Sequence, residues 1–225
     1  MRGGRRDAAV AACPGQGRGN KYMYYVGMDL GQRRDYTAIA VVERRDSVLA
    51  FRAPKFHSIA VVHVERLALG TPYAAVVARV REVVQSDALR GNCSLTVDAT
   101  GVGNPVVEML RAGKLGCEIC AVTITGGERP HSHSGGWNVP KRDLIAEVQV
   151  LLEREELRIA KDLRGLRMLL RELMDVQQRL KSNGGTRLGA DGHGEHDDLA
   201  IALALACWRA MRSRAMFGAG RLPGI

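Results

Sequence analysis

The sequence contains no apolar run long enough to cross a bilayer, which takes about 20 consecutive apolar residues, so we expect no membrane-spanning segment. Its opening is rich in glycine and arginine, and the one apolar stretch there, residues 8–13, is too short for the core of a secretory signal peptide. We therefore expect a cytoplasmic protein without a membrane partner.

Cysteine is scarce and irregularly spaced. Five cysteines in a chain of 225 residues do not suggest a secreted disulfide framework, which uses an even number at regular spacing. Cys117 and Cys120 form a CxxC pair, but no second pair is present to complete a zinc site. They fall in a predicted strand, where positions three apart point to opposite faces. We interpret both as thiols of the core.

Acidic residues are outnumbered by basic ones, with 24 Asp and Glu against 33 Lys and Arg, a net charge of +9. A basic chain favours a polyanionic partner, and nucleic acid is the commonest one. Hydrophobic content of 46% is typical of a globular domain, and neither an internal repeat nor an interdomain linker is visible. We expect a flexible basic arm over 1–21, one domain over 22–211 and a basic tail over 212–225.

The order of predicted elements indicates an α/β fold. Three strands joined by short turns, at 22–30, 36–43 and about 48–56, predict an antiparallel meander. Helices beginning near Thr71 and Asn104 then alternate with strands at 94–97 and 117–124, and a loop follows over 126–137. The remaining predictions are helices over 141–157 and 162–174, a β-hairpin over 176–190 and a last helix over 196–211. This order predicts a mixed sheet, an antiparallel meander followed by parallel strands, with helices on both faces.

Four aspartates stand at the ends of these elements. Asp29 ends the first strand, Asp98 ends the strand over 94–97, and Asp197 and Asp198 open the last helix. Ligands of open α/β sheets bind outside the carboxyl ends of the strands, so these carboxylates are candidates for one site. Converging carboxylates repel one another unless a cation neutralises them, and hard divalent ions prefer oxygen ligands. Each also has an ordinary interpretation, as turn residues for Asp29 and Asp98 and as helix-capping residues for the pair.

Three segments together resemble the nuclease domain of phage large terminase subunits: GMDLGQRRDYTAIAVVE, LTVDATGVGNPVVEML and GEHDDLAIALALA. That domain has an RNase H-like fold, which it shares with Holliday-junction resolvases. The resemblance runs from about Tyr22 to Arg209. It implies a metal-dependent endonuclease, of phage or prophage origin, that cuts double-stranded DNA during genome packaging in a bacterial host cell.

Carried over to this sequence, the resemblance places Asp29, Asp98, Asp197 and Asp198 at the metal-binding acids of the family, with two Mg²⁺ or Mn²⁺ ions as cofactors. It implies double-stranded DNA as a partner, together with a separate terminase ATPase, a small terminase or a portal protein. The sequence has no GxxxxGK[ST] phosphate loop, and its length leaves no room for a motor, so ATPase activity is not predicted.

Basic residues near these elements are candidates for contacts with DNA phosphates, which give affinity without sequence preference. For each of them a solvated or capping role is the alternative. The candidates are Arg179, Lys181 and Arg187 on the predicted hairpin, Lys141 and Arg142 at a helix start, and His196 beside the aspartate pair.

Three other functions remain open. A resolvase that cuts four-way junctions would have the same acids and fold. GMDLGQRRDYTAIAVVE also resembles the phosphate-binding hairpin of actin-like ATPases and sugar kinases, although those folds need a second lobe and a second phosphate hairpin. A DNA-binding module that has lost catalysis is the non-enzymatic alternative, and the four intact acids argue against it.

Overall fold

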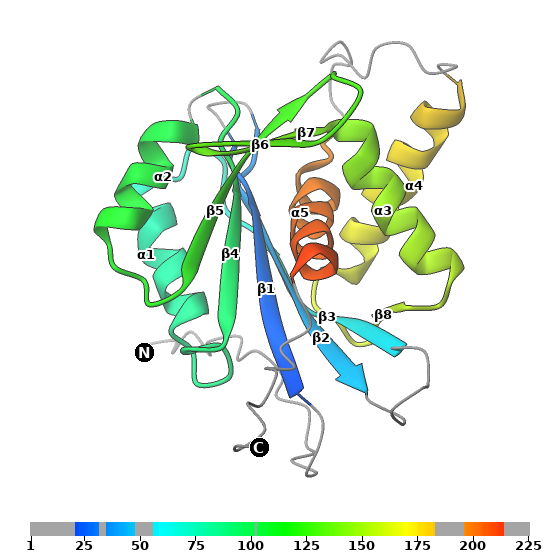
Figure 1. Cartoon of the computed structure of the whole chain (residues 1–225), viewed down its shortest axis with the longest axis horizontal. Coiled ribbons are helices and arrows are strands. Elements are labelled where there is room, and N and C mark those ends of the chain that lie inside the picture. Colours follow the sequence, from blue (N-terminus) through cyan, green and yellow to red (C-terminus); the bar gives the residue numbers. More distant parts are fainter. Residues whose placement is uncertain (1–20, 32–34, 48–55, 102, 183–195, 214–225) are drawn as a thin grey trace, which may run out of the picture.

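An eight-stranded sheet in the order β6-β7-β5-β4-β1-β2-β3-β8 forms the centre of the computed structural model (Figure 1). The structure describes residues 21–31, 35–47, 56–101, 103–182 and 196–213. Most of the predicted arm and tail therefore lies outside the described residues. The strands are β1 (Lys21–Asp29), β2 (Ala38–Ser47), β3 (Phe56–Arg66), β4 (Cys93–Asp98), β5 (Glu118–Thr125), β6 (His131–His133), β7 (Gly136–Pro140) and β8 (Leu157–Ile159). The helices are α1 (Tyr73–Val84), α2 (Gly103–Ala112), α3 (Lys141–Glu153), α4 (Leu166–Ser182) and α5 (Asp198–Arg212).

The sheet is mixed, and only β2 and β6 run opposite to the other six strands. The first three strands form the antiparallel meander β1-β2-β3, whereas β4, β5 and β7 follow one another parallel to β1. At the edges, β6 pairs antiparallel with β7 and β8 pairs parallel with β3. The predicted α/β architecture, a mixed sheet of an antiparallel meander and parallel strands with helices on both faces, is confirmed. None of the described helices is both long and apolar enough to span a bilayer.

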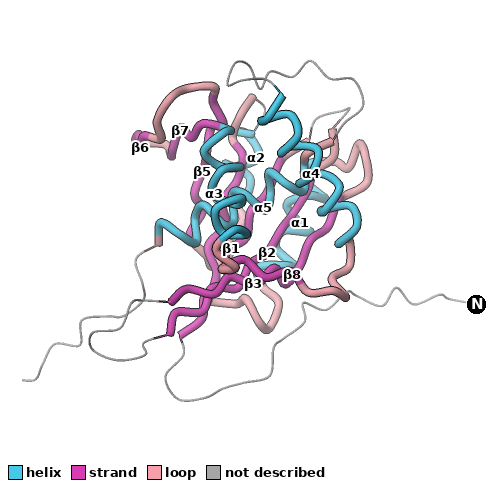
Figure 2. Tube along the Cα trace, turned by 90° about the vertical axis from the view of Figure 1, so that its right-hand side faces the viewer, coloured by secondary structure: helices cyan, strands magenta, loops and turns pink. Residues whose placement is uncertain are grey.

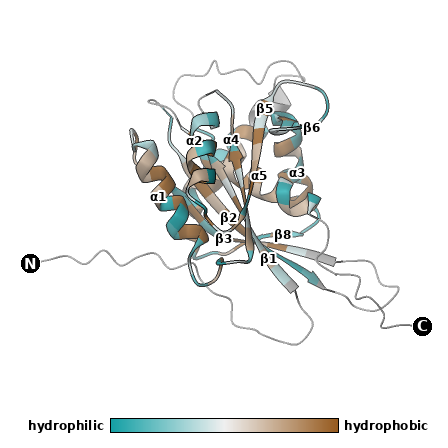
Figure 3. Cartoon of the chain, turned by 60° about the vertical axis from the view of Figure 1, so that its left-hand side comes forward, coloured by the Kyte–Doolittle hydropathy of each residue, from teal (hydrophilic) through white to brown (hydrophobic). Residues whose placement is uncertain are grey.

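The helices form two layers, one on each face of the sheet. Helices α1 and α2 cover one face, and α3, α4 and α5 cover the other (Figures 1 and 2). Successive strand residues alternate between the two cores, so Tyr24 packs with the first layer and Tyr25 with the second. Cys117 and Cys120 also pack on opposite faces, as the sequence predicted. Figure 3 shows both hydrophobic and hydrophilic segments on α1, because only one side of this helix is buried.

Helix α5 lies unusually close to the middle of the sheet. A Cβ atom added to Gly27 of β1 would lie 2.0 Å from the carbonyl oxygen of Ala202 in α5. Only a residue without a side chain fits between the two backbones. The run of alanine and leucine that gives α5 its apolar character is buried against the sheet on one side and α3 and α4 on the other. This close packing sets the height of the α5 N-terminus above the end of β1.

Two predicted strands differ from the described structure. The third described strand is β3 over Phe56–Arg66, which overlaps the predicted segment 48–56 only at Phe56, and residues 48–55 lie outside the described residues. Four β-branched residues within the six of IAVVHV give β3 a stronger strand pattern than residues 48–56 have. The hairpin prediction fails at residues 176–181, which belong to α4. Val176 continues the helical spacing of Leu169 and Leu173, and all three are buried. Residues 183–190 of that hairpin lie outside the described residues.

Three short strands were not predicted. Residues 126–137, expected to form a loop, include β6 and the start of β7. Residues 157–159, at the expected end of a helix, form β8 at the opposite edge. Each of them pairs at one end of the sheet, so its strand conformation depends on a neighbour and has little local signal in the sequence.

Candidate metal centre

Asp29 and Asp98 leave two neighbouring parallel strands at the same level. Met28 pairs with Val97 in the register of β1 and β4, and the two aspartates are the next residue on each strand. Asp29 follows Gly27 by two residues, so its side chain lies on the face covered by α5. The prediction that both carboxylates lie at one edge of the sheet is therefore met.

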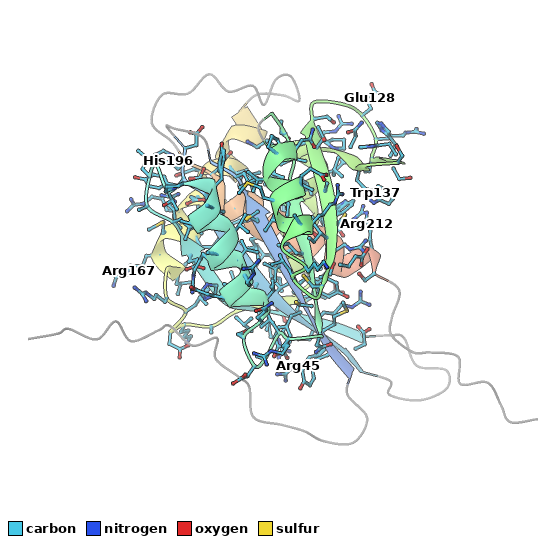
Figure 4. The ribbon with its side chains drawn as sticks, turned by 90° about the vertical axis from the view of Figure 1, so that its left-hand side faces the viewer. Arg45, Glu128, Trp137, Arg167, His196 and Arg212 are labelled. Carbon is cyan, nitrogen blue, oxygen red and sulfur yellow. The ribbon has the colours of Figure 1, made fainter. Side chains whose placement is uncertain are left out.

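The strand pairing that contains Asp29 continues across β2 to Arg66 of β3. Asp29 pairs with Ala38 of β2, and Ala38 pairs with Arg66 at the end of β3. The guanidinium of Arg66 lies over the ring of Tyr36, 4.6 Å from its centroid, and the Tyr36 ring meets the ring of His196 edge to face. This end of the sheet therefore presents two carboxylates and one arginine toward the N-terminus of α5. His196 and Glu128 lie toward this end in Figure 4, and Arg45 lies at the other.

The acidic pair at the start of α5 does not cap its own helix. Asp197 occupies the N-cap position, but its side chain accepts no capping hydrogen bond. Glu172 of α4 takes that role, because its Oε2 accepts the backbone N–H groups of Leu199 at 2.8 Å and Ala200 at 3.0 Å. The capping interpretation of the pair is therefore wrong for Asp197, and its carboxylate bonds elsewhere.

Four aspartates act on one another electrostatically at this edge. Burial is the largest cause of a strongly raised pKa at Asp29, and the charges of Asp98, Asp198 and Asp197 raise that pKa further. The ammonium of Lys141 opposes them and lowers it. Like charges shift one another's pKa in this way only over short distances, so the four carboxyl groups share one region.

Asp98 is held in place by the turn that follows its strand. Its Oδ1 accepts the backbone N–H of Thr100 at 2.8 Å and the hydroxyl of Thr100 at 2.5 Å. The Thr100 hydroxyl oxygen in turn accepts the N–H of Ile124 at 2.9 Å. Burial raises the pKa of Asp98, while the Thr100 bonds and Lys141 work in the opposite direction. The turn thus fixes one carboxylate oxygen and favours its ionised form.

Two side-chain cations pair with the acids at α5. Lys141 Nζ lies 2.7 Å from Asp197 Oδ2, and an Arg66 nitrogen lies 3.3 Å from Asp198 Oδ2 while it also bonds Glu172. His196 Nδ1 is 3.8 Å from the same Asp198 oxygen. Burial nevertheless raises the pKa of Asp198 to about 6 and that of Glu172 to about 7, with Arg66 opposing both shifts. Two cations stand among five carboxyl groups, so full ionisation would leave an excess of negative charge, which the raised pKa values oppose.

The donor chemistry fits a hard divalent cation. All four aspartates offer carboxylate oxygens, the ligands that Mg²⁺ prefers, and the buried Oδ2 of Asp198 receives no hydrogen bond. Within the described part of the chain, however, no three His, Cys, Asp or Glu side chains stand where they would hold one ion together. Asp197 is paired with Lys141 instead. The site therefore has the right ligands in one region, and side chains must rotate to surround an ion.

The residues predicted to contact DNA lie in different surroundings. Lys141 lies within the acidic site, and Arg142 beside it is exposed and donates to the carbonyl oxygen of Glu128 at 2.8 Å. His196 is half-buried against Tyr36. Arg179 and Lys181 belong to α4 and not to a hairpin, and their side chains, like the whole of Arg187, lie outside what the structure describes.

Sequence reasoning missed Glu172 and Arg66. Glu172 interrupts the buried stripe of α4 formed by Leu169, Leu173 and Val176, and a charged residue on such a stripe is a signal of a buried polar contact. Arg66 was missed because the third strand was placed too early. Neither position could be joined to the aspartates without knowing that the N-terminal half of α4 and the end of β3 lie beside the start of α5.

No protein-family model and no curated protein matches the sequence. Among solved structures, the chain is similar to the human cytomegalovirus terminase nuclease domain, with 13% identity and a TM-score of 0.49 over 83% of this chain and 82% of that domain. It is similar to Thermus thermophilus RuvC, with 15% identity and a TM-score of 0.37 over 85% and 98% of the two chains. For T. thermophilus RuvC in complex with a Holliday junction substrate, the values are 18% and 0.36 over 84% and 96%.

Proposed function

We propose that this chain is a metal-dependent endonuclease that hydrolyses DNA phosphodiesters at the carboxyl edge of its sheet. The observation that carries the proposal is the common level of Asp29 and Asp98 on parallel strands, with Asp197 and Asp198 near enough to raise the pKa of Asp29. A buried group of like charges costs stability unless a ligand offsets it. Such a cost at the end of a sheet indicates a functional site.

Asp29, Asp98, Asp197 and Asp198 would hold the divalent ions, Mg²⁺ or Mn²⁺. When bound in a pair, such ions activate a water molecule and stabilise the leaving 3′ oxygen of a phosphodiester. The protein's own part is to fix the carboxylates. Thr100 orients Asp98, and Glu172 together with Arg66 fixes the first turn of α5, which carries the other two.

Binding of DNA is supported by the charge of the chain and by cations next to the site. The net charge is +9, and Arg142 is exposed one residue beyond Lys141. Phosphate contacts of this kind position a duplex without reading its sequence, so we expect little sequence preference. The segments that resemble terminase nucleases support a role in packaging viral or prophage DNA, with the ATPase motor supplied by a different part of the machinery.

Cleavage of a supercoiled plasmid tests the proposal. The wild-type protein should convert it to nicked and linear forms with Mn²⁺ or Mg²⁺ but not with EDTA. Asp98→Asn should lower the rate about a hundredfold or more, because it removes one charged ligand from the site. Asp162→Asn, at an exposed carboxylate that lines a different surface, is the matched control and should cleave like the wild type.

Three results would replace this function by another. Cleavage that persists in EDTA or in Asp98→Asn would remove the nuclease assignment to these acids. Faster cutting of synthetic four-way junctions than of linear duplexes would assign the site to a resolvase. Turnover of ATP by the purified chain would favour the actin-like interpretation of the first hairpin.

A further inference from the structure

Lys141 is placed where a bound cation would be attracted. It is the first residue of α3 and directly follows Pro140, the last residue of β7, so its backbone is fixed at the same edge of the sheet as Asp98. Its Nζ lies 2.7 Å from Asp197 Oδ2, and its charge lowers the pKa of both Asp29 and Asp98. One ammonium group therefore acts on three of the four aspartates, and these three lie on different elements of the fold.

This ion pair is accessible to solvent and can open. The side chains of Lys141 and Asp197 are 27% and 22% exposed, whereas the ion pair between Arg66 and Glu172 is far more buried. A partly exposed ion pair of this kind contributes little to stability. The flexible four-carbon side chain of lysine lets the ammonium group leave Asp197 without disturbing the helix. Arg66, in contrast, is fixed by its contacts with Tyr36 and Glu172. Of these two residues, Lys141 is therefore the one whose charged group can move away from its carboxylate partner.

We infer that Lys141 is a built-in counter-cation that occupies Asp197 in the metal-free protein and must leave this carboxylate when a divalent ion binds. The inference rests on the proposed function, since it takes the four aspartates as the ligands of that ion. It explains why no three described carboxylates surround a single point, although three of them act on Asp29. The ammonium and the metal compete for the same oxygen, so the lysine weakens metal binding and holds the acids together without it.

Direct titration with Mn²⁺ alone, without DNA, tests the competition. Lys141→Met keeps the length of the side chain and removes its charge. It should bind Mn²⁺ about tenfold more tightly than the wild type, the change expected from removing one partly screened unit charge close to the ion. The loss of free Mn²⁺ is followed by electron paramagnetic resonance. Circular dichroism checks the fold, and Lys141→Gln serves as a second variant with the same expectation.

Arg142→Met is the matched control. It removes the same charge one residue away, but its guanidinium bonds the carbonyl oxygen of Glu128 and pairs with Asp143, which is outside the set of four aspartates. Its Mn²⁺ affinity should stay within about twofold of the wild type, because an exposed charge outside the site is screened. Equal affinities for the wild type and both Lys141 variants, or an equal gain in Arg142→Met, would overturn the inference while leaving the metal site intact. Absence of Mn²⁺ binding by every variant would overturn the proposed function itself.

A second measurement follows the lysine in the unmodified protein. Acylation of Lys141 by a dilute anhydride reagent, read by mass spectrometry, should be slow without metal and faster with saturating Mg²⁺, because the amine is then released from Asp197. The exposed Lys114 and Lys161 are internal references whose labelling should not change. The double variant Lys141→Met/Asp98→Asn should lose the gain in Mn²⁺ affinity. Unchanged labelling of Lys141 together with detectable metal binding would also overturn the inference.

Discussion

The carboxylate of Glu172 accepts the backbone N–H of Leu199 at 2.8 Å, although the two residues lie 27 positions apart. The first N–H groups of a helix have no partner within it, and α5 begins with aspartates that do not satisfy them. A side chain of α4 therefore caps α5 from outside. This arrangement leaves Asp197 and Asp198 available for contacts across the edge of the sheet.

Replacement of Glu172 should be costly. In Glu172→Ala, two buried N–H groups lose their acceptor and Arg66 loses one of its two carboxylate partners, so the free energy of unfolding should fall by about 2–4 kcal/mol. Denaturant unfolding at pH 8, above the pKa of about 7 for Glu172, measures the loss. Glu108→Ala, on the exposed face of α2, removes only a surface pair with Arg111 and should change stability by about 0.5 kcal/mol or less. Equal losses in the two variants would show that Glu172 is not the cap.

The contact between β1 and α5 should tolerate no side chain. Gly27→Ala places a methyl group 2.0 Å from the carbonyl oxygen of Ala202 and 2.7 Å from the nitrogen of Ala206. The helix must move away from the strand, and we expect a loss of about 3 kcal/mol or more in the free energy of unfolding, the upper end of the range for overpacking. Gly126→Ala, where a Cβ atom meets nothing within 4 Å, should stay within about 0.5 kcal/mol of the wild type.

The buried acids predict a stability that falls with rising pH in the absence of metal. The pKa of Asp198 is about 6 in the folded chain, above the value near 4 of an unfolded aspartate, so the folded state binds the proton more tightly. The stabilising contribution of this proton is fully present below about pH 4 and is lost as the pH rises through about 6. In EDTA, Asp198→Asn should therefore gain stability relative to the wild type between pH 4 and pH 7, by about 2–3 kcal/mol.

Unfolding curves at pH 4, 5, 6 and 7 measure this difference. Asp162→Asn, at an exposed position of the segment between β8 and α4, should follow the pH dependence of the wild type throughout. If the free energies of unfolding of the wild type and Asp198→Asn depend on pH in the same way, the burial of an unneutralised charge at this position is contradicted.

Thr100 should matter through Asp98. Thr100→Val removes the hydroxyl that donates to Asp98 Oδ1 and accepts from Ile124, while it keeps the shape of the side chain. The loss of this bond should raise the pKa of Asp98, and plasmid cleavage should fall more at pH 6 than at pH 8. Thr125→Val, whose hydroxyl only accepts the exposed N–H of Gly127, provides the control and should show no such pH-dependent loss. A uniform fall at every pH would contradict a role in keeping Asp98 ionised.

The sequence predicts the parts of the site that depend on strand ends. Asp29 and Asp98 each follow a short apolar strand, and two parallel strands bring their carboxyl ends to one edge wherever the helices fall. The last helix can be predicted equally well, because its apolar run and its acidic start are local sequence patterns. These features require no knowledge of which distant residues meet.

Contacts between elements were beyond the same reasoning. That Glu172 caps α5 depends on the position of α4 against α5, and that Arg66 faces Asp198 depends on the register of three strands. The hairpin predicted over 176–190 is wrong over 176–181, because the buried stripe through Val176 extends α4 up to Ser182. Here tertiary packing along a helical stripe outweighs the local strand pattern, and residues 183–190 lie outside the described residues.

The position of α5 in the chain determines when the site can be completed during translation. The face of the sheet that carries Tyr25, Gly27 and Asp29 packs against α5, which follows every described strand and helix in the chain. Until residues 198–212 have emerged from the ribosome, the helix that packs on Gly27 is missing, and Asp197 and Asp198 are not yet beside Asp29 and Asp98. The proposed set of four metal-binding aspartates is therefore complete only after α5 docks on the sheet.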